Sequence, residues 1–156
     1  MAPPLKVVFA FLASFGTAFF AYLFINPAVL DWYASLIKPA FAPSETTFAV
    51  IWLIMYGAMA TALAIAWTKD PRPSHIEGWV RFFFAQLLFN ASCMMFFFGF
   101  QAVLVAFVTL LFLGFIVLSL TVSAGEIDRR TVYLMLAYFL WVLYNGYLTV
   151  SIWLLN

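Results

Sequence analysis

Charge is what this sequence has least of. Only 8% of its 156 residues are Asp, Glu, Lys or Arg, and none of these lies in the 44 residues between Arg81 and Glu126. As one helix, that run would be about 66 Å long, roughly twice the ~30 Å hydrocarbon core of a bilayer. It must therefore fold back once, and we expect a turn at residues 98–101 in which Gly99 supplies the bend and Gln101 a polar contact. Because a soluble domain cannot bury two adjacent segments that are apolar on every face, the chain is predicted to lie in a membrane.

Metal-binding and acid–base side chains are almost as scarce. Cys93 is the only cysteine and His75 the only histidine, so an internal disulfide is excluded and no metal site is expected. No Asp, Glu, Lys, Arg or His lies inside a predicted span away from its ends, which argues against an ion-coupled carrier and against hydrolysis. The net charge of +1 gives no indication of a nucleic-acid partner. The spans are left to bind something largely apolar.

The chain consists mostly of apolar residues: 67% are hydrophobic and 21% are aromatic. Its charge-free runs predict a single domain, residues 1–156, that is an all-α integral membrane protein with five transmembrane helices. The expected helices are 7–26, 46–67, 79–98, 102–123 and 132–154. Residues 27–45 form the longest connection and are expected outside the membrane. A cleaved signal peptide is not expected, because the first apolar run is nearly of full bilayer length.

The basic residues indicate an orientation. Five crossings place the N-terminus and the loops 68–78 and 124–131 on one side. That side carries six of the seven basic residues, namely Lys6, Lys69, Arg72, Arg81, Arg129 and Arg130. The other side carries only Lys38. Because short cytoplasmic loops are enriched in Lys and Arg, the N-terminus is predicted to face the cytoplasm, most simply that of a bacterial cell.

The connection on the sparsely charged side is too aromatic for a solvated linker. Its large apolar residues are Trp32, Tyr33, Leu36 and Phe41, and Pro39 and Pro43 stiffen its second half. One interpretation is an interfacial segment that holds Trp and Tyr in the aromatic belt of the membrane. The other is a lid over a cavity between the helices. The sequence alone leaves both open.

Polar and aromatic residues recur at helical spacing in three predicted spans. The second span carries Phe48, Trp52, Tyr56 and Met59, the third carries Gln86, Asn90, Cys93 and Phe97, and the fifth carries Tyr138, Trp141, Asn145, Leu148 and Ile152. Buried amides need hydrogen-bond partners, so Gln86, Asn90 and Asn145 should face protein or a cavity. They either bond neighbouring helices only or belong to an apolar ligand pocket with a few polar groups.

The loop and these stripes resemble the translocator protein family, also called tryptophan-rich sensory proteins. The loop motif is Trp32-Tyr33-x-x-Leu36-x-Lys38-Pro39-x-Phe41-x-Pro43, followed by Phe48, Trp52 and Tyr56. Further matches are Gln86, Leu87 and Asn90, then Phe96 and Phe97, and finally Tyr138, Trp141 and Leu148. The resemblance therefore covers essentially the whole chain.

The resemblance implies a five-helix bundle, usually a homodimer, whose cavity is capped by the first loop and binds porphyrins such as protoporphyrin IX. The ligand-binding positions that it implies are Tyr33, Trp52, Tyr56, Asn90, Phe97 and Trp141. Cys93, where the family usually has Trp, and Asn145 are added as pocket residues that should change its volume and polarity. Lys38 is expected either to meet a peripheral carboxylate of the ligand or to be structural. The partners are then a planar apolar molecule and membrane lipid, and no further cofactor is required.

Departures from the family pattern narrow this expectation. Phe41 replaces a loop tryptophan, Ser44 the second loop proline, Ala137 a proline and Thr149 an asparagine, and Leu154 replaces the basic residue that animal members carry in a sterol-recognition stretch. Sterol binding is therefore not expected. Three functions remain open: binding, sensing or transport of porphyrins; light- and oxygen-dependent porphyrin degradation with Trp52 and Trp141 as redox partners; and a small multipass carrier with no porphyrin role.

Overall fold

The computed structural model describes residues 2–69 and 73–156, with side chains left out of the description for 73–75. Within these residues the elements are α1 (Pro3–Tyr22), α2 (Pro27–Ser35), α3 (Glu45–Lys69), α4 (Pro73–Met94), the π-helical turn η1 (Met95–Gly99), α5 (Val103–Ser123), the 3₁₀ turn η2 (Ala124–Glu126) and α6 (Arg129–Leu155). Five segments of the described chain are long and apolar enough to cross a membrane, whereas α2 has only 9 residues. The predicted all-α five-helix bundle is confirmed. Arg72, part of the predicted basic side, lies outside the described residues.

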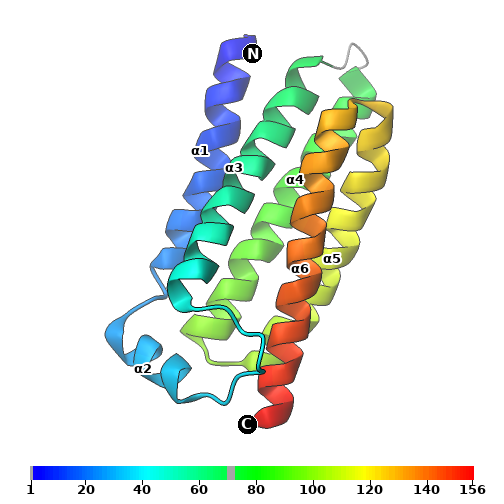
Figure 1. The fold of residues 1–156 in the computed structure, drawn as a ribbon. Helices are drawn as coiled ribbons and strands as arrows, with labels where there is room; N and C mark the ends of the chain where they lie inside the picture. The colour runs from blue at the N-terminus through cyan, green and yellow to red at the C-terminus, as the bar shows by residue number, and fades with distance from the viewer. Residues whose placement is uncertain (1, 70–72) are drawn as a thin grey trace.

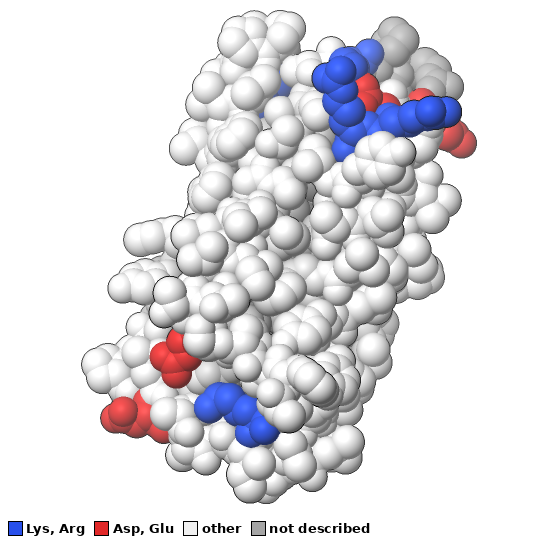
Figure 2. Space-filling view, in the orientation of Figure 1, with Lys and Arg blue, Asp and Glu red and all other residues white. Residues whose placement is uncertain are grey.

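The helices form one bundle with α1 at its edge (Figure 1). α1 packs on α3, α3 also contacts α6, and α5 packs between α4 and α6. The N-terminus and the α5–α6 connection lie at one end, whereas α2 and the C-terminus lie at the other, which we call the lid end (Figure 1). On the face drawn in Figure 2, charged side chains gather at the two ends and leave an uncharged band between them.

Helix α1 ends earlier than the sequence predicted. It stops at Tyr22 instead of residue 26, because a tight turn follows and a new helix begins at Pro27. Asn26 caps α2 by accepting a hydrogen bond from the Val29 amide at 3.1 Å, and proline suits the first helical position because its missing N–H has no helical partner there. The connection 27–45 therefore contains a helix that our sequence analysis did not predict.

The turn between α4 and α5 lies where it was expected, but the prediction for Gly99 was wrong. Gln101, with a φ of 54°, adopts the left-handed conformation, and no described glycine does. Gly99 is required for packing instead, since a Cβ atom there would lie 2.7 Å from the Phe24 ring. Gly99 is the last residue of the π-helical turn η1, which also brings the Phe97 and Phe98 rings into contact with Tyr33 of α2.

The half of the bundle away from the lid is tightly packed. Trp79 stacks on Phe83 at 5.4 Å between ring centroids, and its indole N–H donates to the Leu120 carbonyl at 3.1 Å. At the surface of this end, Lys69 pairs with Asp128 at 2.6 Å, which joins the end of α3 to the start of α6. The Trp79 hydrogen bond and the Lys69–Asp128 ion pair thus connect α4 to α5 and α3 to α6 in the half opposite the lid.

Candidate functional site

The lid segment, residues 27–45, lies across the lid end with Trp32 and Tyr33 against the bundle, whereas Phe41 is exposed. Tyr33 contacts Phe97 and Phe98 with ring centroids 6.1 and 5.7 Å apart, and Trp32 contacts Phe97 at 5.6 Å. Val29 is buried in the same cluster. Because Trp32 and Tyr33 are half-buried on the end of α4, the geometry matches a lid better than an interfacial belt.

Two sets of hydrogen bonds attach the lid segment to α6. The Ile37 N–H donates to Asn156 Oδ1 at 2.9 Å, and Asn156 Nδ2 donates back to the Ile37 carbonyl at 3.0 Å. Further along, the Tyr144 hydroxyl donates to the Phe41 carbonyl at 2.7 Å. Lys38 places its ammonium 4.4 Å from the centroid of the Tyr33 ring, a cation–π contact. The second half of the lid is therefore attached to α6 through hydrogen bonds of the Ile37 and Phe41 backbone, in addition to apolar packing.

The Tyr33 hydroxyl remains protonated well beyond neutral pH. Burial raises the pKa of Tyr33 above its ordinary value, and the negative charge of Glu45 and the proximity of Tyr144 add to this. A neutral phenol can both donate and accept a hydrogen bond. Tyr33 can therefore offer either to a molecule beneath the lid.

Beneath the lid lies a cavity of about 50 Å³, called here the inner cavity, between α3, α4, α5 and α6. Six of the eight sequence-predicted ligand-binding residues line it, namely Tyr33, Trp52, Asn90, Cys93, Phe97 and Asn145. Its volume suffices for a few water molecules, which need at least about 10–15 Å³ each, but not for an organic ring system. The predicted residues are thus brought together around a space that is small in this conformation.

A second, lateral cavity of about 430 Å³ opens between α1, α2, α3 and the end of α4. Tyr56, a predicted residue, lines this cavity and not the inner one. Five residues border both cavities: Tyr33, Phe48, Trp52, Met94 and Phe98. These side chains form the wall between the two cavities. If the side chains rotated, the inner and lateral cavities would become one space.

A chain of hydrogen bonds crosses the bundle beside the inner cavity. The Tyr56 hydroxyl donates to Asn90 Oδ1 at 2.6 Å, and Asn90 Nδ2 donates to the Tyr138 hydroxyl at 2.9 Å. The three residues are buried and come from α3, α4 and α6. The Asn90 amide therefore bonds neighbouring helices, although each of its polar atoms can make a second bond. Asn145 Nδ2 donates to the Trp141 carbonyl of its own helix at 2.6 Å.

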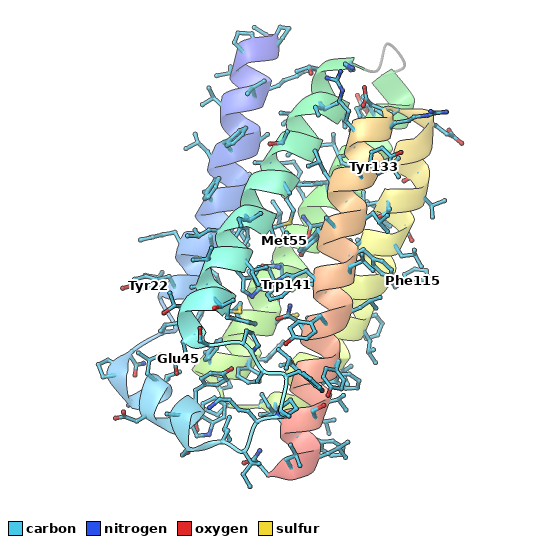
Figure 3. The ribbon with its side chains drawn as sticks, in the orientation of Figure 1. Tyr22, Glu45, Met55, Phe115, Tyr133 and Trp141 are labelled. Atoms are coloured by element: carbon cyan, nitrogen blue, oxygen red, sulfur yellow. The ribbon has the colours of Figure 1, made fainter. Side chains whose placement is uncertain are left out.

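Trp52 and Trp141 form an aromatic pair between α3 and α6, where Figure 3 shows Trp141. Their ring centroids are 6.1 Å apart, and Phe48 contacts Trp141 at 5.6 Å. The Nε1 atoms of both indoles are buried with no hydrogen-bond partner among the described residues. Trp141 does not line either cavity, because the Trp52 and Phe48 rings lie against it.

Several lining residues were missed by the sequence analysis. Phe48 lay on a recognised stripe but was not chosen, while Met94 and Phe98 are turned towards the cavities by η1. Tyr22 and Glu45 line the lateral cavity from the end of α1 and the start of α3. Of these residues, only Phe48 could have been predicted from the sequence, through its helical spacing with Trp52. Phe98 lies in the π-helical turn, which no sequence pattern here indicates.

Comparison with known proteins gives one consistent answer. The sequence profile of the TspO/MBR family matches residues 7–154. The tryptophan-rich protein TspO of Chlorobaculum tepidum is 28% identical over 138 residues, covering 88% of this chain and 87% of that protein. The TspO of Bacillus cereus is 25% identical over 96% of this chain and 95% of its own, and the translocator protein of Bos taurus is 29% identical over 98% and 92%. The bundle, its lid segment and these matches together show that the chain belongs to the TspO/MBR family.

Proposed function

We propose that this chain binds porphyrins and similar planar apolar molecules within the membrane, and senses, sequesters or carries them. The proposal rests on the pair of adjoining cavities beneath an aromatic lid. Tyr33, Phe48 and Trp52 border both cavities, and aromatic rings stack on a flat macrocycle. The lateral cavity falls in the range of small-molecule sites, ~300–1,000 Å³. A macrocycle would enter there and displace the shared side chains towards the inner cavity.

Unpaired indole groups support the same proposal. The buried N–H groups of Trp52 and Trp141 have no acceptor among the described residues, and an unsatisfied buried donor costs about 1–3 kcal/mol. A ligand carrying a carboxylate or ring-nitrogen acceptor would remove that cost for Trp52, and for Trp141 once the Trp52 and Phe48 rings move aside. Lys38, above the Tyr33 ring, would meet a peripheral carboxylate at the lid.

The test is a titration of protoporphyrin IX against purified protein, followed by tryptophan fluorescence. We expect saturable quenching, with affinity about tenfold weaker, or about 1.4 kcal/mol, in both Trp52→Phe and Trp141→Phe. Trp67→Phe is the matched control, because Trp67 packs on Phe9 and Phe84, remote from both cavities. Quenching that does not saturate, or that is equal in all three variants, contradicts a defined site.

The indole pair also favours a second candidate, light- and oxygen-dependent degradation of bound porphyrin. Rings 6.1 Å apart are close enough for one indole to reduce the other after electron transfer to the excited ligand. We expect a new absorption product that requires both light and oxygen and is lost in Trp141→Phe. Bleaching at the rate of free porphyrin excludes this activity.

We further propose that the N-terminus faces the cytoplasm of a bacterial cell, because five of the six basic residues that the structure describes lie at the end opposite the lid. Cys93 is buried, so cysteines introduced at Ala2 and Ala40 can be labelled separately with a membrane-impermeant maleimide. Labelling of intact cells at position 40 but not at position 2 is expected, and the reverse excludes the orientation.

The homodimer that the family resemblance implies stays a prediction. Light scattering of the purified protein would test it.

A further inference from the structure

The lateral cavity has an apolar wall built from small residues. Ala18 and Ala21 on α1 face Ala49 and Leu53 on α3, and Met94 and Phe98 close the inner side. Short side chains on two neighbouring helices leave room that larger ones would fill. The space therefore suits an apolar chain or ring that arrives between α1 and α3.

Among the residues that the structure describes, Glu45 is the carboxylate that lines this cavity. It lies in the first turn of α3, and its side chain has no ion-pair or hydrogen-bond partner within the described residues. Figure 3 shows Glu45 at the start of α3 and Tyr22 at the end of α1, just above α2. A carboxylate in a first turn also stabilises its helix through the helix dipole, by ~0.3–1 kcal/mol. That role requires no ligand and must be separated by experiment.

Within the described residues, no basic side chain pairs with Glu45 at the mouth of the cavity. Lys38, which lies at the lid end, has its ammonium over the Tyr33 ring and does not line the lateral cavity. The charge of Glu45 reaches the shared wall, since after burial it is the largest contribution to the raised pKa of Tyr33. At the mouth of the cavity this exposed carboxylate favours a ligand whose polar group carries a positive charge.

We propose that the lateral cavity binds amphiphilic primary amines, whose apolar part fills the space between α1 and α3 while the ammonium pairs with Glu45. The charge complementarity selects the cation, and the apolar wall selects its aromatic or aliphatic body. An alkyl ammonium group remains charged at neutral pH, as a lysine side chain does. The site overlaps the space through which a macrocycle is proposed to enter, but it rests on Glu45, which the porphyrin proposal does not use, so the two proposals can fail separately.

Monodansylcadaverine is a suitable probe, because it joins a primary amine to a fluorophore that accepts energy from tryptophan. Trp52 lines the lateral cavity and serves as donor. The protein is held in nanodiscs of phosphatidylcholine, which carries no net charge. We expect saturable energy transfer that weakens about fivefold in Glu45→Gln, which is the upper range for a partly exposed ion pair. The N-acetylated probe, which lacks the charge, should bind more weakly and show no difference between the two proteins.

Two further variants make the outcome decisive. Asp31→Asn removes another exposed carboxylate at the lid end, outside the cavity lining, and should leave amine affinity unchanged. Ala49→Phe fills the cavity from an exposed position and should abolish binding while far-UV circular dichroism stays unchanged. Equal weakening by Glu45→Gln and Asp31→Asn, retention of binding in Ala49→Phe, or equal affinity for the amine and its acetyl derivative each overturns the proposal. In a parallel titration, Glu45→Gln should not weaken the affinity for protoporphyrin, which carries no ammonium group to pair with Glu45.

Discussion

The two halves of the bundle are built from similar residues but packed differently. In the half opposite the lid, large side chains such as Met59, Leu63 and Phe83 are completely buried and close against each other. In the half beneath the lid, side chains of the same size surround two cavities. Apolar composition alone therefore does not determine where a membrane bundle is solid and where it is hollow.

The difference arises from chain geometry at the lid end. The π-helical turn η1 shifts the last residues of α4 out of the regular helical register, and Gly99 lets the Phe24 ring approach the backbone there. α2 then closes the end from outside without filling the space beneath it. The solid half fixes the helices, which allows the hollow half to remain open.

The largest expected effect comes from removing a ring in the solid half. Phe83→Ala should lower the free energy of unfolding by about 3 kcal/mol, because the surrounding side chains cannot collapse into the space. Phe48→Ala, beside existing cavities, should cost less than half of this but change protoporphyrin affinity. Thermal unfolding in detergent measures both variants. Equal costs would remove the distinction between the halves.

Asn90 lies at the border of the two halves, where its loss should be intermediate in effect. Asn90→Leu leaves the Tyr56 and Tyr138 hydroxyls without the partner that joins α3, α4 and α6, at a cost of about 2 kcal/mol. Tyr56→Phe removes one of these bonds only and should cost about half as much. Thermal unfolding of both variants is the measurement. A Leu variant as stable as wild type would mean that the two phenols bond each other instead.

A smaller, local effect is expected at the lid. Tyr144→Phe removes the hydrogen bond to the Phe41 carbonyl, so amides near residues 40–43 should exchange with solvent about fivefold faster, which corresponds to about 1 kcal/mol. Tyr147→Phe is the matched control one turn away, since no hydrogen bond of the Tyr147 hydroxyl is recorded within the described residues. The melting temperature should stay constant in both variants. Exchange that is unchanged in Tyr144→Phe means that the lid is held elsewhere.

The smallest effect belongs to the surface of the solid half. Hydrogen bonds from Lys69 and from the Arg130 amide lower the pKa of Asp128. Because the folded pKa lies below the unfolded value of about 3.9, this contribution is complete above pH ~4 and is lost as the pH falls through the folded pKa. Asp128→Asn keeps a helix-capping side chain but removes the charge, so its melting temperature should be slightly lower near neutral pH and converge with wild type in acid. Parallel curves across this range would exclude the contribution.

The sequence could predict the spans because charged residues end each apolar run. Helical spacing could also predict that Trp52, Asn90 and Asn145 line one pocket, because residues spaced by three or four project from one face of a helix. It could not predict that Trp141 lies behind Trp52, since that depends on how α3 and α6 meet. Helix α2 had a signal that was overlooked, an Asn26–Pro27 pair suited to a helix start. The role of Gly99 had none, because the Phe24 ring that contacts it is distant in sequence.

Helix α6 connects features that lie on opposite faces of the membrane. Its 27 residues form an uninterrupted rod about 40 Å long, with Asp128 and its Lys69 partner at one end and the Asn156–Ile37 amide pair at the other. A displacement of the lid segment at Ile37 would pull on the end of this rod, so the amide pair is the point at which a motion of the lid would be passed to α6.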